Sequence, residues 1–266
     1  RAGAAARRRN DPVEARLKHP IFDPLRVWLD RIGAPVSLDV LNLFSEEKNL
    51  RTESGKPIRF VPPSSADPYY EVHLFETGNV QTRADNWHDL FNALVWLAFP
   101  RTKARINALH AAQIAREAGK RGRLRDMLTL FDEGGAIVEC AGPALAGMIR
   151  QFRWTNLFWE NRSRLRRGLR IHVLGHAVLE MALAPWPGIT CKVIFVPVGI
   201  EPDAAAADWL RADRRPQDLA ALPVFGYPGW FPGNDRAQFY ADERYFRPFR
   251  RELPSSNYGK AGNLVS

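Results

Sequence analysis

Three ionisable residues recur at four-residue intervals in LRIHVLGHAVLEMAL (169–183), namely His172, His176 and Glu180. Residues four apart lie on one face of a helix, so the spacing predicts a stripe of two imidazoles and a carboxylate. Imidazole nitrogens and carboxylate oxygens bind divalent ions, and the carboxylate could instead act as a base. The alternative is structural, with one histidine hydrogen-bonded in the core and one exposed. A divalent metal ion, zinc or manganese, is therefore the candidate cofactor, with these three residues as ligands.

A second group of polar residues lies in NWHDLFNALVWLAF (86–99), which is apolar on nearly every face and predicts a buried helix. Burying His88, Asp89 and Asn92 is costly unless each finds a partner, so they belong either to core hydrogen bonds or to a site. Asn86 is the expected N-cap, and Asp89 could reach back to it in a capping box. His88 and Asn92 share a face of the helix.

A third group follows Pro100, which is expected to end that helix. Thr102 is the expected cap of a second helix that runs to about residue 118. Two helices joined by so short a turn should pack as a hairpin, which could bring His110 near the first helix. Basic residues at the start of the second helix are candidates for holding an anionic substrate: Arg101, Lys103 and Arg105.

The stretch LTLFDEGGAIVEC (128–140) predicts two short strands around a tight turn at Asp132 to Gly135. It is superficially similar to the first motif of haloacid-dehalogenase-type phosphatases, an apolar strand followed by Asp-x-Asp-Gly-Thr. The second aspartate and the threonine of that motif are absent here, so the hairpin turn is favoured. Asp132 stays a candidate carboxylate for a site built by other elements.

With 266 residues, of which 45% are hydrophobic, the chain can bury a substantial core. No apolar window is long enough to cross a bilayer, which predicts a soluble or peripheral protein. Cys140 and Cys191 both lie in apolar surroundings, and two buried thiols suit a reducing, cytoplasmic compartment. The expected organisation is a basic flexible arm (1–20), a single α+β domain (21–253) and a flexible tail (254–266).

The formal net charge of +9 is concentrated in two arginine-rich spans, 101–125 and 150–170. Such spans attract polyanions, although a solvated helix face explains them equally well. In the second span Phe152, Trp154, Phe158 and Trp159 alternate with arginines. Interleaved aromatic and basic residues can stack bases and hold phosphates, but aromatic residues at helical spacing are more often core.

The expected elements describe an α+β protein, predominantly helical, with a small sheet of about five short strands packed on central helices. Strands and helices do not alternate strictly, so a doubly wound sheet is not expected. The aromatic, Gly- and Pro-rich tail from residue 222 should wrap over the body as an extended lid. Besides the segments above, helices are expected at 23–33, 38–49, 144–167 and 203–213 (capped by Asp203), strands at 57–61 and 69–76, and a turn followed by a buried strand at 185–198.

Five blocks together resemble one family, the bacterial DUF3025 proteins, a domain of unknown function. The resemblance implies a single unit in a bacterial cytosol and no particular activity. The blocks are NWHDLFNALVWLAFPRTKARINALH (86–110), LTLFDEGGAIV (128–138), GHAVLEMALAPWPGIT (175–190), VFGYPGWFPGND (224–235) and FYADERYFRPFR (239–250).

The first functional hypothesis is a hydrolase-type enzyme acting on an anionic, phosphate-bearing substrate. Histidine beside a carboxylate supports general acid–base chemistry or metal-activated water. The chain has no nucleophile elbow, P-loop or zincin signature. The candidate catalytic residues are His88, Asp89, His110, Asp132, His176 and Glu180. The candidate substrate-binding residues are Asn92, Arg101, Lys103 and Arg105.

The second hypothesis is a non-enzymatic RNA- or nucleic-acid-binding protein that uses the two arginine-rich spans. Its affinity should fall steeply with salt, whereas an enzyme should lose activity but keep its fold when a catalytic histidine is replaced. The sequence leaves the oligomeric state open.

Overall fold

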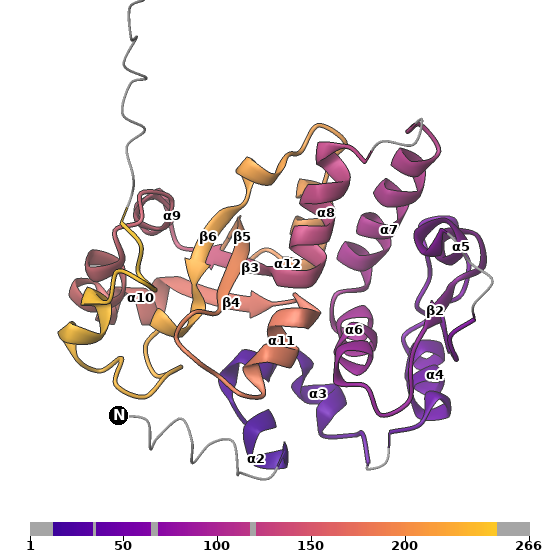
Figure 1. Cartoon of the computed structure of the whole chain (residues 1–266), viewed down its shortest axis with the longest axis horizontal. Helices are drawn as coiled ribbons and strands as arrows, with labels where there is room; N and C mark the ends of the chain where they lie inside the picture. The colour runs from indigo at the N-terminus through magenta and orange to yellow at the C-terminus, as the bar shows by residue number, and fades with distance from the viewer. Residues whose placement is uncertain (1–12, 34–35, 65–68, 118–120, 249–266) are drawn as a thin grey trace, which may run out of the picture.

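The computed structural model describes residues 13–33, 36–64, 69–117 and 121–248. It is an α+β protein, 53% helical and 14% strand, with two small sheets packed among helices (Figure 1). The expected fold class is confirmed. No helix in the described part of the chain is both long enough and apolar enough to cross a membrane.

The main sheet has four strands in the order β4-β3-β5-β6. Strand β3 pairs with β4 in the antiparallel sense and with β5 in the parallel sense, and β5 pairs antiparallel with β6. A second sheet is a parallel pair of β1 and β2. The strands are β1 Arg59–Val61, β2 Asn79–Gln81, β3 Gly135–Cys140, β4 Leu169–Val173, β5 Thr190–Pro197 and β6 Ala220–Pro223.

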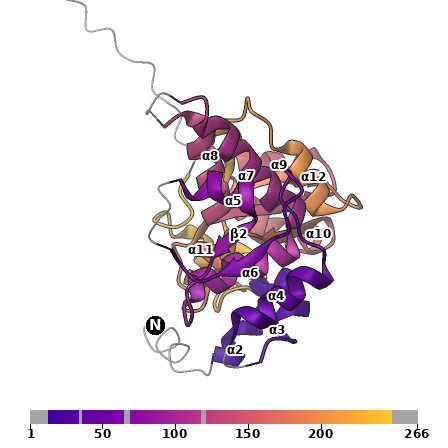
Figure 2. The same cartoon turned by 90° about the vertical axis from the view of Figure 1, so that its right-hand side faces the viewer.

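The helices surround this sheet and extend to one side of it, and α2, α3 and α4 gather in the lower part of both views (Figures 1 and 2). The α-helices are α2 Val13–Leu17, α3 Arg26–Leu29, α4 Leu38–Glu47, α5 Tyr70–Thr77, α6 Trp87–Ala98, α7 Pro100–Ile114, α8 Arg123–Gly134, α9 Pro143–Arg150, α10 Arg162–Gly168, α11 His176–Ala182 and α12 Pro202–Trp209. Short turns are 3-10 helices η1 Pro20–Leu25, η3 Pro216–Asp218, η4 Val224–Gly226 and η5 Ala237–Ala241, and the π-helix η2 Asn156–Glu160.

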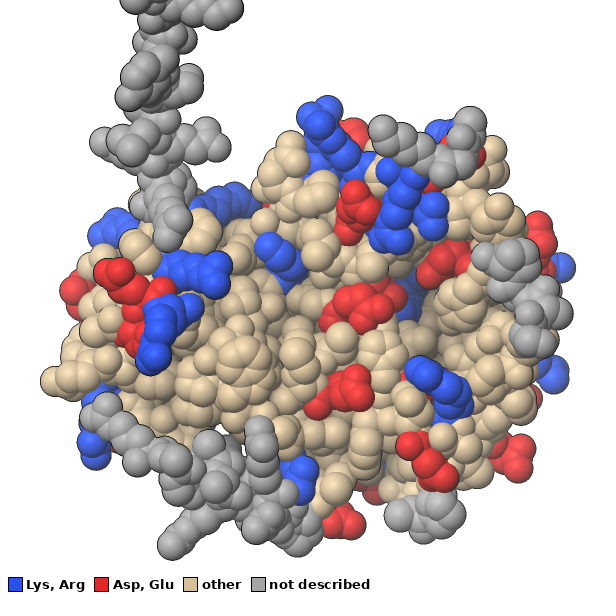
Figure 3. Space-filling model, in the orientation of Figure 1, with Lys and Arg blue, Asp and Glu red and all other residues tan. Residues whose placement is uncertain are grey.

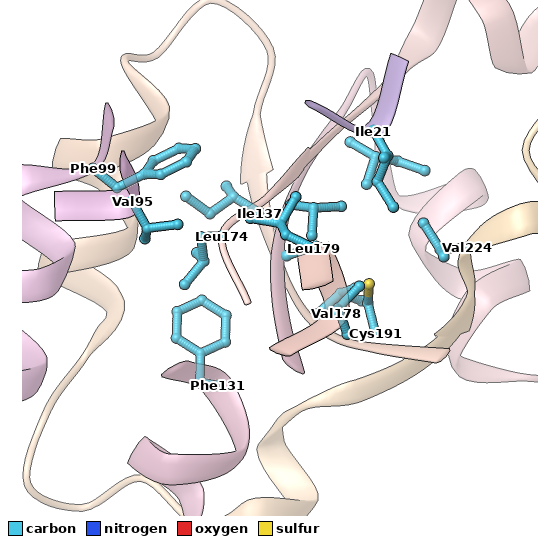
Figure 4. Close-up of a cluster of buried hydrophobic side chains, with 14 of the residues drawn as sticks. Ile21, Val95, Phe99, Phe131, Ile137, Leu174, Val178, Leu179, Cys191 and Val224 are labelled. Atoms are coloured by element: carbon cyan, nitrogen blue, oxygen red, sulfur yellow. The ribbon is translucent and has the colours of Figure 1, made fainter. Parts of the chain in front are cut away.

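The hydrophobic core joins the sheet to the helices that carry the chemistry. Phe131 of α8, Ile137 of β3 and Val178 of α11 are all buried, as is Val95 of α6, and Figure 4 shows their side chains around one interior. Burial of such side chains stabilises each by about 1.5–3 kcal/mol relative to exposure. Core packing therefore holds α6, α8 and α11 in fixed positions relative to one another.

Two of the expected strands are helical, which corrects the sequence interpretation. Residues 69–76 form most of α5, which packs against α7, so an apparent alternation of period two yields to tertiary packing. The expected hairpin at 128–140 is instead α8 running directly into β3 at Gly135. The buried residues Leu124, Met127, Leu128 and Phe131 follow helical spacing, a pattern that begins before the expected hairpin.

The expected helix at 169–183 is divided. Residues Leu169–Val173 form β4, and α11 begins only at His176. In β4 the buried residues alternate, so Leu169, Ile171 and Val173 face the interior while Arg170 does not. This period-two pattern was present in the sequence and defines a strand that pairs with β3.

The two consecutive helices are confirmed as α6 and α7, but their caps differ in part from expectation. Asn86 caps α6 by accepting a hydrogen bond from the Asp89 backbone N–H, as predicted. Thr102 lies inside α7 and does not cap it. The Asp203 carboxylate instead accepts from the backbone N–H groups of Arg101 and Thr102, while Glu201 caps α12. A distant acidic side chain thus stabilises the N-terminus of α7.

The aromatic segment beyond β6 has little regular structure, as expected, and buries Phe225, Tyr240, Tyr245 and Phe246. The expected tail at 254–266 and the first twelve residues of the expected basic arm lie outside the described residues. The remainder of that arm contains α2 and the start of η1.

Candidate functional site

A close approach of two backbones brings α11 to the end of α8. A Cβ on Gly175 would lie 2.5 Å from the Gly135 nitrogen and 2.6 Å from the Gly134 carbonyl carbon. The backbone N–H groups of Leu174 and Gly175 both donate to the Gly135 carbonyl. As a result His176, the first residue of α11, lies beside the last turn of α8.

The first turn of α6 completes the group, because α6 packs against α11. The rings of His88 and His176 lie 4.5 Å apart between centroids, at 74° to each other. Asn86 defines where α6 begins and thereby places His88 at its second residue. Two histidines that are 88 residues apart in the chain therefore meet edge to face.

Both imidazoles face one carboxylate, that of Glu133. Its Oε2 lies 3.4 Å from His176 Nε2 and 3.9 Å from His88 Nε2. One ligand atom from each of these three residues lies within 4.8 Å of the other two. Two nitrogens and one oxygen at this separation can converge on a single divalent ion after small side-chain rotations.

The other ring nitrogen of each histidine faces a second carboxylate. His88 Nδ1 lies 3.1 Å from Glu180 Oε2, and His176 Nδ1 lies 4.0 Å from Asp132 Oδ2. Histidines that bind metals commonly orient their second nitrogen toward a carboxylate, which sets the ring orientation and raises the basicity of the ligand nitrogen. The arrangement therefore supplies three ligands together with outer carboxylates for both imidazoles.

A buried lysine lies next to this group. Lys103 Nζ donates to Asp132 Oδ1 at 2.5 Å and to Asn92 Oδ1 at 2.9 Å, and the Lys103 side chain is 5% exposed. Burial by itself would raise the pKa of Asp132, but the attraction of Lys103 and His176 outweighs it and lowers that pKa. Asp132 is therefore ionised at neutral pH and balances the lysine charge.

Burial also determines the protonation of His176. It lowers the pKa of this histidine to about 4, although Asp132 acts in the opposite direction. The ring is neutral at pH 7 and keeps a lone pair for a metal ion. The pKa of Glu133 is raised, first by burial and then by the nearby Asp132 charge. A bound cation would lower the pKa of Glu133 again, because its positive charge favours the ionised carboxylate.

These groups line a cavity of about 280 Å³ between α5, α6, α7, α8 and α11. Figure 3 shows Asp and Glu side chains near the middle of this face, over α8 and α11. The side chains of Glu133 and Glu180 are 44% and 45% exposed, so solvent reaches the mouth of the site. The ionisable residues that line the cavity are Glu71, Arg83, His88, Asp89, Lys103, Asp132, Glu133 and His176.

Six of the residues singled out from the sequence meet at this site: His88, Asn92, Lys103, Asp132, His176 and Glu180. Asp89 also lines the cavity, but its carboxylate accepts from the Arg83 backbone N–H and guanidinium. Burial opposes this ion pair, yet the Arg83 contacts lower the pKa of Asp89. Its side chain therefore completes no capping box with Asn86, and Asp89 serves as a partner for Arg83.

His172 does not belong to the site, so the predicted ligand set of His172, His176 and Glu180 is corrected. His172 lies on β4, where its Nε2 is 2.6 Å from Glu139 Oε1 across the pairing with β3. His172 belongs to a strand and His176 to a helix. The four-residue spacing therefore does not place the two imidazole rings on one face, as it would within a single helix. Glu133, rather than His172, completes the group with His176.

His110 is buried within α7, and its Nδ1 has no hydrogen-bond partner among the described residues. Burial lowers the pKa of His110 to about 4, partly countered by Asp132. It lies near the charged groups without lining the cavity. His110 is therefore not among the residues that meet at the cavity.

The two arginines proposed to bind substrate lie elsewhere. Arg101 is exposed, and its backbone N–H is bound by Asp203. The Arg105 guanidinium donates to the Leu210 carbonyl and to Glu53. Neither lines the cavity. Lys103 lies two residues from Arg101 and two residues from Arg105. On a helix this spacing places the three side chains on different faces, so Lys103 points inward and the two arginines do not.

Sequence reasoning missed six polar residues that line the cavity: Tyr70, Glu71, Gln81, Arg83, Asn107 and Glu133. Tyr70 and Glu71 were assigned to a strand, and Glu133 to a turn. Glu133 could have been found from its position next to Asp132 once that segment was recognised as helical. Asn107 had one signal, since it lies four residues after Lys103 on the same helix.

These features define an α+β protein with a His/carboxylate cavity of the kind that holds divalent metal ions. Residues 58–250 match the family described as "Protein of unknown function (DUF3025)". The chain therefore belongs to the DUF3025 family, as its resemblance indicated. No curated protein and no solved structure matches the chain.

Proposed function

We propose that this protein is a metal-dependent hydrolase that acts on a small phosphate-bearing substrate. The observation that carries the proposal is the convergence of His88 Nε2 and His176 Nε2 on the Glu133 carboxylate at the cavity mouth. Two histidines and one carboxylate form a common ligand set of catalytic zinc. The cavity of about 280 Å³ suits a small ligand.

Three protein ligands leave coordination positions open for water and substrate. A divalent ion there would polarise a phosphoryl oxygen and lower the pKa of a bound water. In the hydrolytic step the water oxygen bonds to phosphorus, the P–O bond to the leaving group breaks, and the leaving oxygen takes up a proton. Glu180 is half-exposed beside His88 Nδ1, the ring nitrogen that faces away from Glu133, and is the candidate to orient that ring for metal binding.

The charges around the cavity support an anionic substrate once a metal is bound. Lys103 and Arg83 line the cavity, and each already has an acidic partner, Asp132 or Asp89. A divalent cation would add two positive charges to this balanced set. A phosphate group would then be attracted to the metal side of the cavity.

The cellular setting is part of the same proposal. Both cysteines are free and buried, which fits a reducing compartment, and we place the protein in a bacterial cytoplasm.

The nucleic-acid-binding hypothesis has less support from the structure. Trp154 and Phe158 are buried and not available to stack bases, whereas Phe152 is partly buried and Trp159 is 36% exposed. In the first arginine-rich span Arg105, Arg121 and Arg125 each pair with an acidic side chain. This hypothesis predicts steeply salt-dependent RNA binding, which a titration at two salt concentrations would detect.

Elemental analysis of the purified, tag-free protein tests the metal site. We expect near-stoichiometric zinc or manganese in the wild type and its loss in His88→Ala and in His176→Ala, with circular dichroism reporting the fold. His172→Ala is the matched control and should retain the metal. A metal-free wild type that takes up none on addition, or equal metal content in folded His176→Ala protein, overturns the proposal.

A phosphatase assay tests the reaction. The metal-loaded protein should release inorganic phosphate from small phosphate monoesters, and chelation followed by metal return should abolish and restore that release. Replacing a metal ligand should lower the rate of phosphate release by about a hundredfold or more, because the activated water is lost. Phosphate release that survives both chelation and Glu133→Gln would exclude the metal-based reaction.

A further inference from the structure

Glu71 and Asn107 form a polar wall of the cavity that the metal chemistry does not use. Asn107 Nδ2 donates to Glu71 Oε2 at 2.7 Å and to the Glu71 backbone carbonyl at 2.8 Å. Glu71 comes from α5 and Asn107 from α7, and both line the cavity. The side chain of Asn107 therefore ties the two helices together at the cavity surface.

The two acceptors determine which way the Asn107 amide faces. A backbone carbonyl can only accept a hydrogen bond, so the nitrogen of the amide must face Glu71. The Oδ1 atom then faces away from Glu71. It is buried, in a residue that is 2% exposed, and has no hydrogen-bond partner among the described residues. A buried acceptor without a partner is costly, by about 1–3 kcal/mol.

A purely structural tie between α5 and α7 needs only the Nδ2 contacts. It does not require a second acceptor in the cavity wall or a carboxylate held next to it. The Glu71 carboxyl group accepts from Asn107 through Oε2, and burial raises its pKa, with Asn107 acting in the opposite direction. An acceptor that lacks a donor is suited to a ligand that supplies one.

This wall comes from α5 and α7, whereas the proposed metal ligands come from α6, α8 and α11. Asn107 follows Lys103 by one helical turn, about 6 Å along α7. Figure 1 places α5 and α11 on opposite sides of α6 and α7. A small ligand that spans the cavity would contact the metal ligands at one end and Glu71 with Asn107 at the other.

We propose that Glu71 and Asn107 form a recognition subsite for a hydrogen-bond-donating group of the substrate, a hydroxyl or an amine. The substrate class is then a small phosphate ester whose alcohol portion carries such a donor. This inference rests on the proposed metal-dependent hydrolase for the position of the phosphate. The donor satisfies the Asn107 Oδ1 acceptor, and an ester without it leaves that acceptor unpaired.

Calorimetric titration with three phosphonates of matched size tests the subsite, because phosphonates are not hydrolysed as esters are. The ligands are 2-aminoethylphosphonate, 2-hydroxyethylphosphonate and ethylphosphonate, added to metal-loaded protein. At least one donor-bearing ligand should bind ten- to a hundredfold more tightly than ethylphosphonate. The amine and hydroxyl arms show which donor the subsite takes. Glu71→Gln turns one acceptor into a donor and should reduce the preference to less than threefold.

Glu76→Gln is the control, since Glu76 is exposed on the same helix and does not line the cavity. It should leave the preference unchanged. Metal content measured on each sample separates the two proposals. A protein without metal contradicts the hydrolase and, with it, the subsite. A metal-loaded protein that binds ethylphosphonate as tightly as the other two, that binds none of them, or that keeps its preference in Glu71→Gln contradicts the subsite alone.

Discussion

Two regions of this molecule pair histidine with glutamate, and they differ in what surrounds the pair. In the sheet, His172 and Glu139 lie 2.6 Å apart across β4 and β3, with Arg170 also within 3.9 Å of Glu139. In the cavity, His88 and His176 share Glu133 and each faces a further carboxylate. The first is a closed pair, whereas the second has more acceptors than its histidines need. Excess carboxylates around a pair of histidines indicate a cation site, and a satisfied pair indicates a structural contact.

The largest contrast should appear when the charge balance of each region is broken. Lys103→Met leaves Asp132 buried without its cation and should lower the free energy of unfolding by about 3–5 kcal/mol. Adding Asp132→Asn should recover much of that loss. In the closed pair, His172→Leu with Glu139→Leu removes both partners and should cost under about 1 kcal/mol. Urea unfolding of the metal-free proteins measures the stability of all three variants. Equal losses of stability in the cavity and in the sheet would show that the two regions do not differ in this way.

The pH dependence of stability should report the buried cavity histidine. The pKa of His176 is lowered to about 4 by burial, whereas an unfolded histidine has a pKa of about 6.5. Between these values the unfolded chain binds more protons, so stability should fall as the pH drops from about 6.5 to 4. Each unit of pKa corresponds to about 1.4 kcal/mol, so the full loss is on the order of 3 kcal/mol.

His176→Gln removes that proton binding and should flatten the decline, as measured by urea unfolding of metal-free protein at pH 7 and pH 4.5. His110 has the same direction of shift, since burial lowers its pKa to about 4, and should account for a comparable share of the decline. A decline of equal size in the wild type and in His176→Gln would show that His176 does not titrate in this way.

The backbone contact that builds the cavity should tolerate no side chain. Gly175→Ala places a Cβ 2.5–2.6 Å from the Gly134–Gly135 backbone and should cost about 1–3 kcal/mol while weakening metal binding. Gly147→Ala is the matched control, because it lies in α9 with no atom near its Cβ and should be neutral or stabilising by up to about 1 kcal/mol. Thermal unfolding measures the stability of each variant, and metal titration measures its metal affinity. Identical results for the two variants would contradict the role given to Gly175.

The smallest effect tests the outer carboxylates. Glu180→Gln removes the charge that faces His88 Nδ1 and should weaken metal affinity by about ten- to a hundredfold. Glu139→Gln alters the corresponding partner of His172 and should not change metal affinity. Competition with a chromophoric chelator measures the dissociation constants. Equal weakening by both substitutions would place the effect in the general fold rather than in the orientation of His88.

Much of the helical framework was predictable because it depends on local signals. The apolar run after Asn86 predicted α6, Pro100 separated it from α7, and the helix expected at 38–49 is α4, which Ser37 caps. N-caps, proline and helical periodicity act within a few residues, so they are readable without tertiary information. Lys103 of α7 contacts Asn92 of α6, and the short turn between these two helices makes this contact possible.

Other elements could not be assigned from local pattern. The segments at 69–76 and 128–134 are helical because they pack against α7 and the sheet, although their residues also suit strands. The reverse holds at 169–173, where pairing with β3 makes a strand of residues expected to be helical. Short apolar segments of this kind take the conformation that buries most surface in the assembled core.

The sequence by itself determined the family, the buried character of α6 and the presence of histidines and carboxylates in otherwise apolar segments. Only the tertiary structure decided which of them meet. Gly175 lies 40 positions from Gly135, yet their contact places His176 beside Glu133, while β4 carries His172 to Glu139 instead. Contacts between residues so far apart depend on how the core packs as a whole, and no local spacing encodes them.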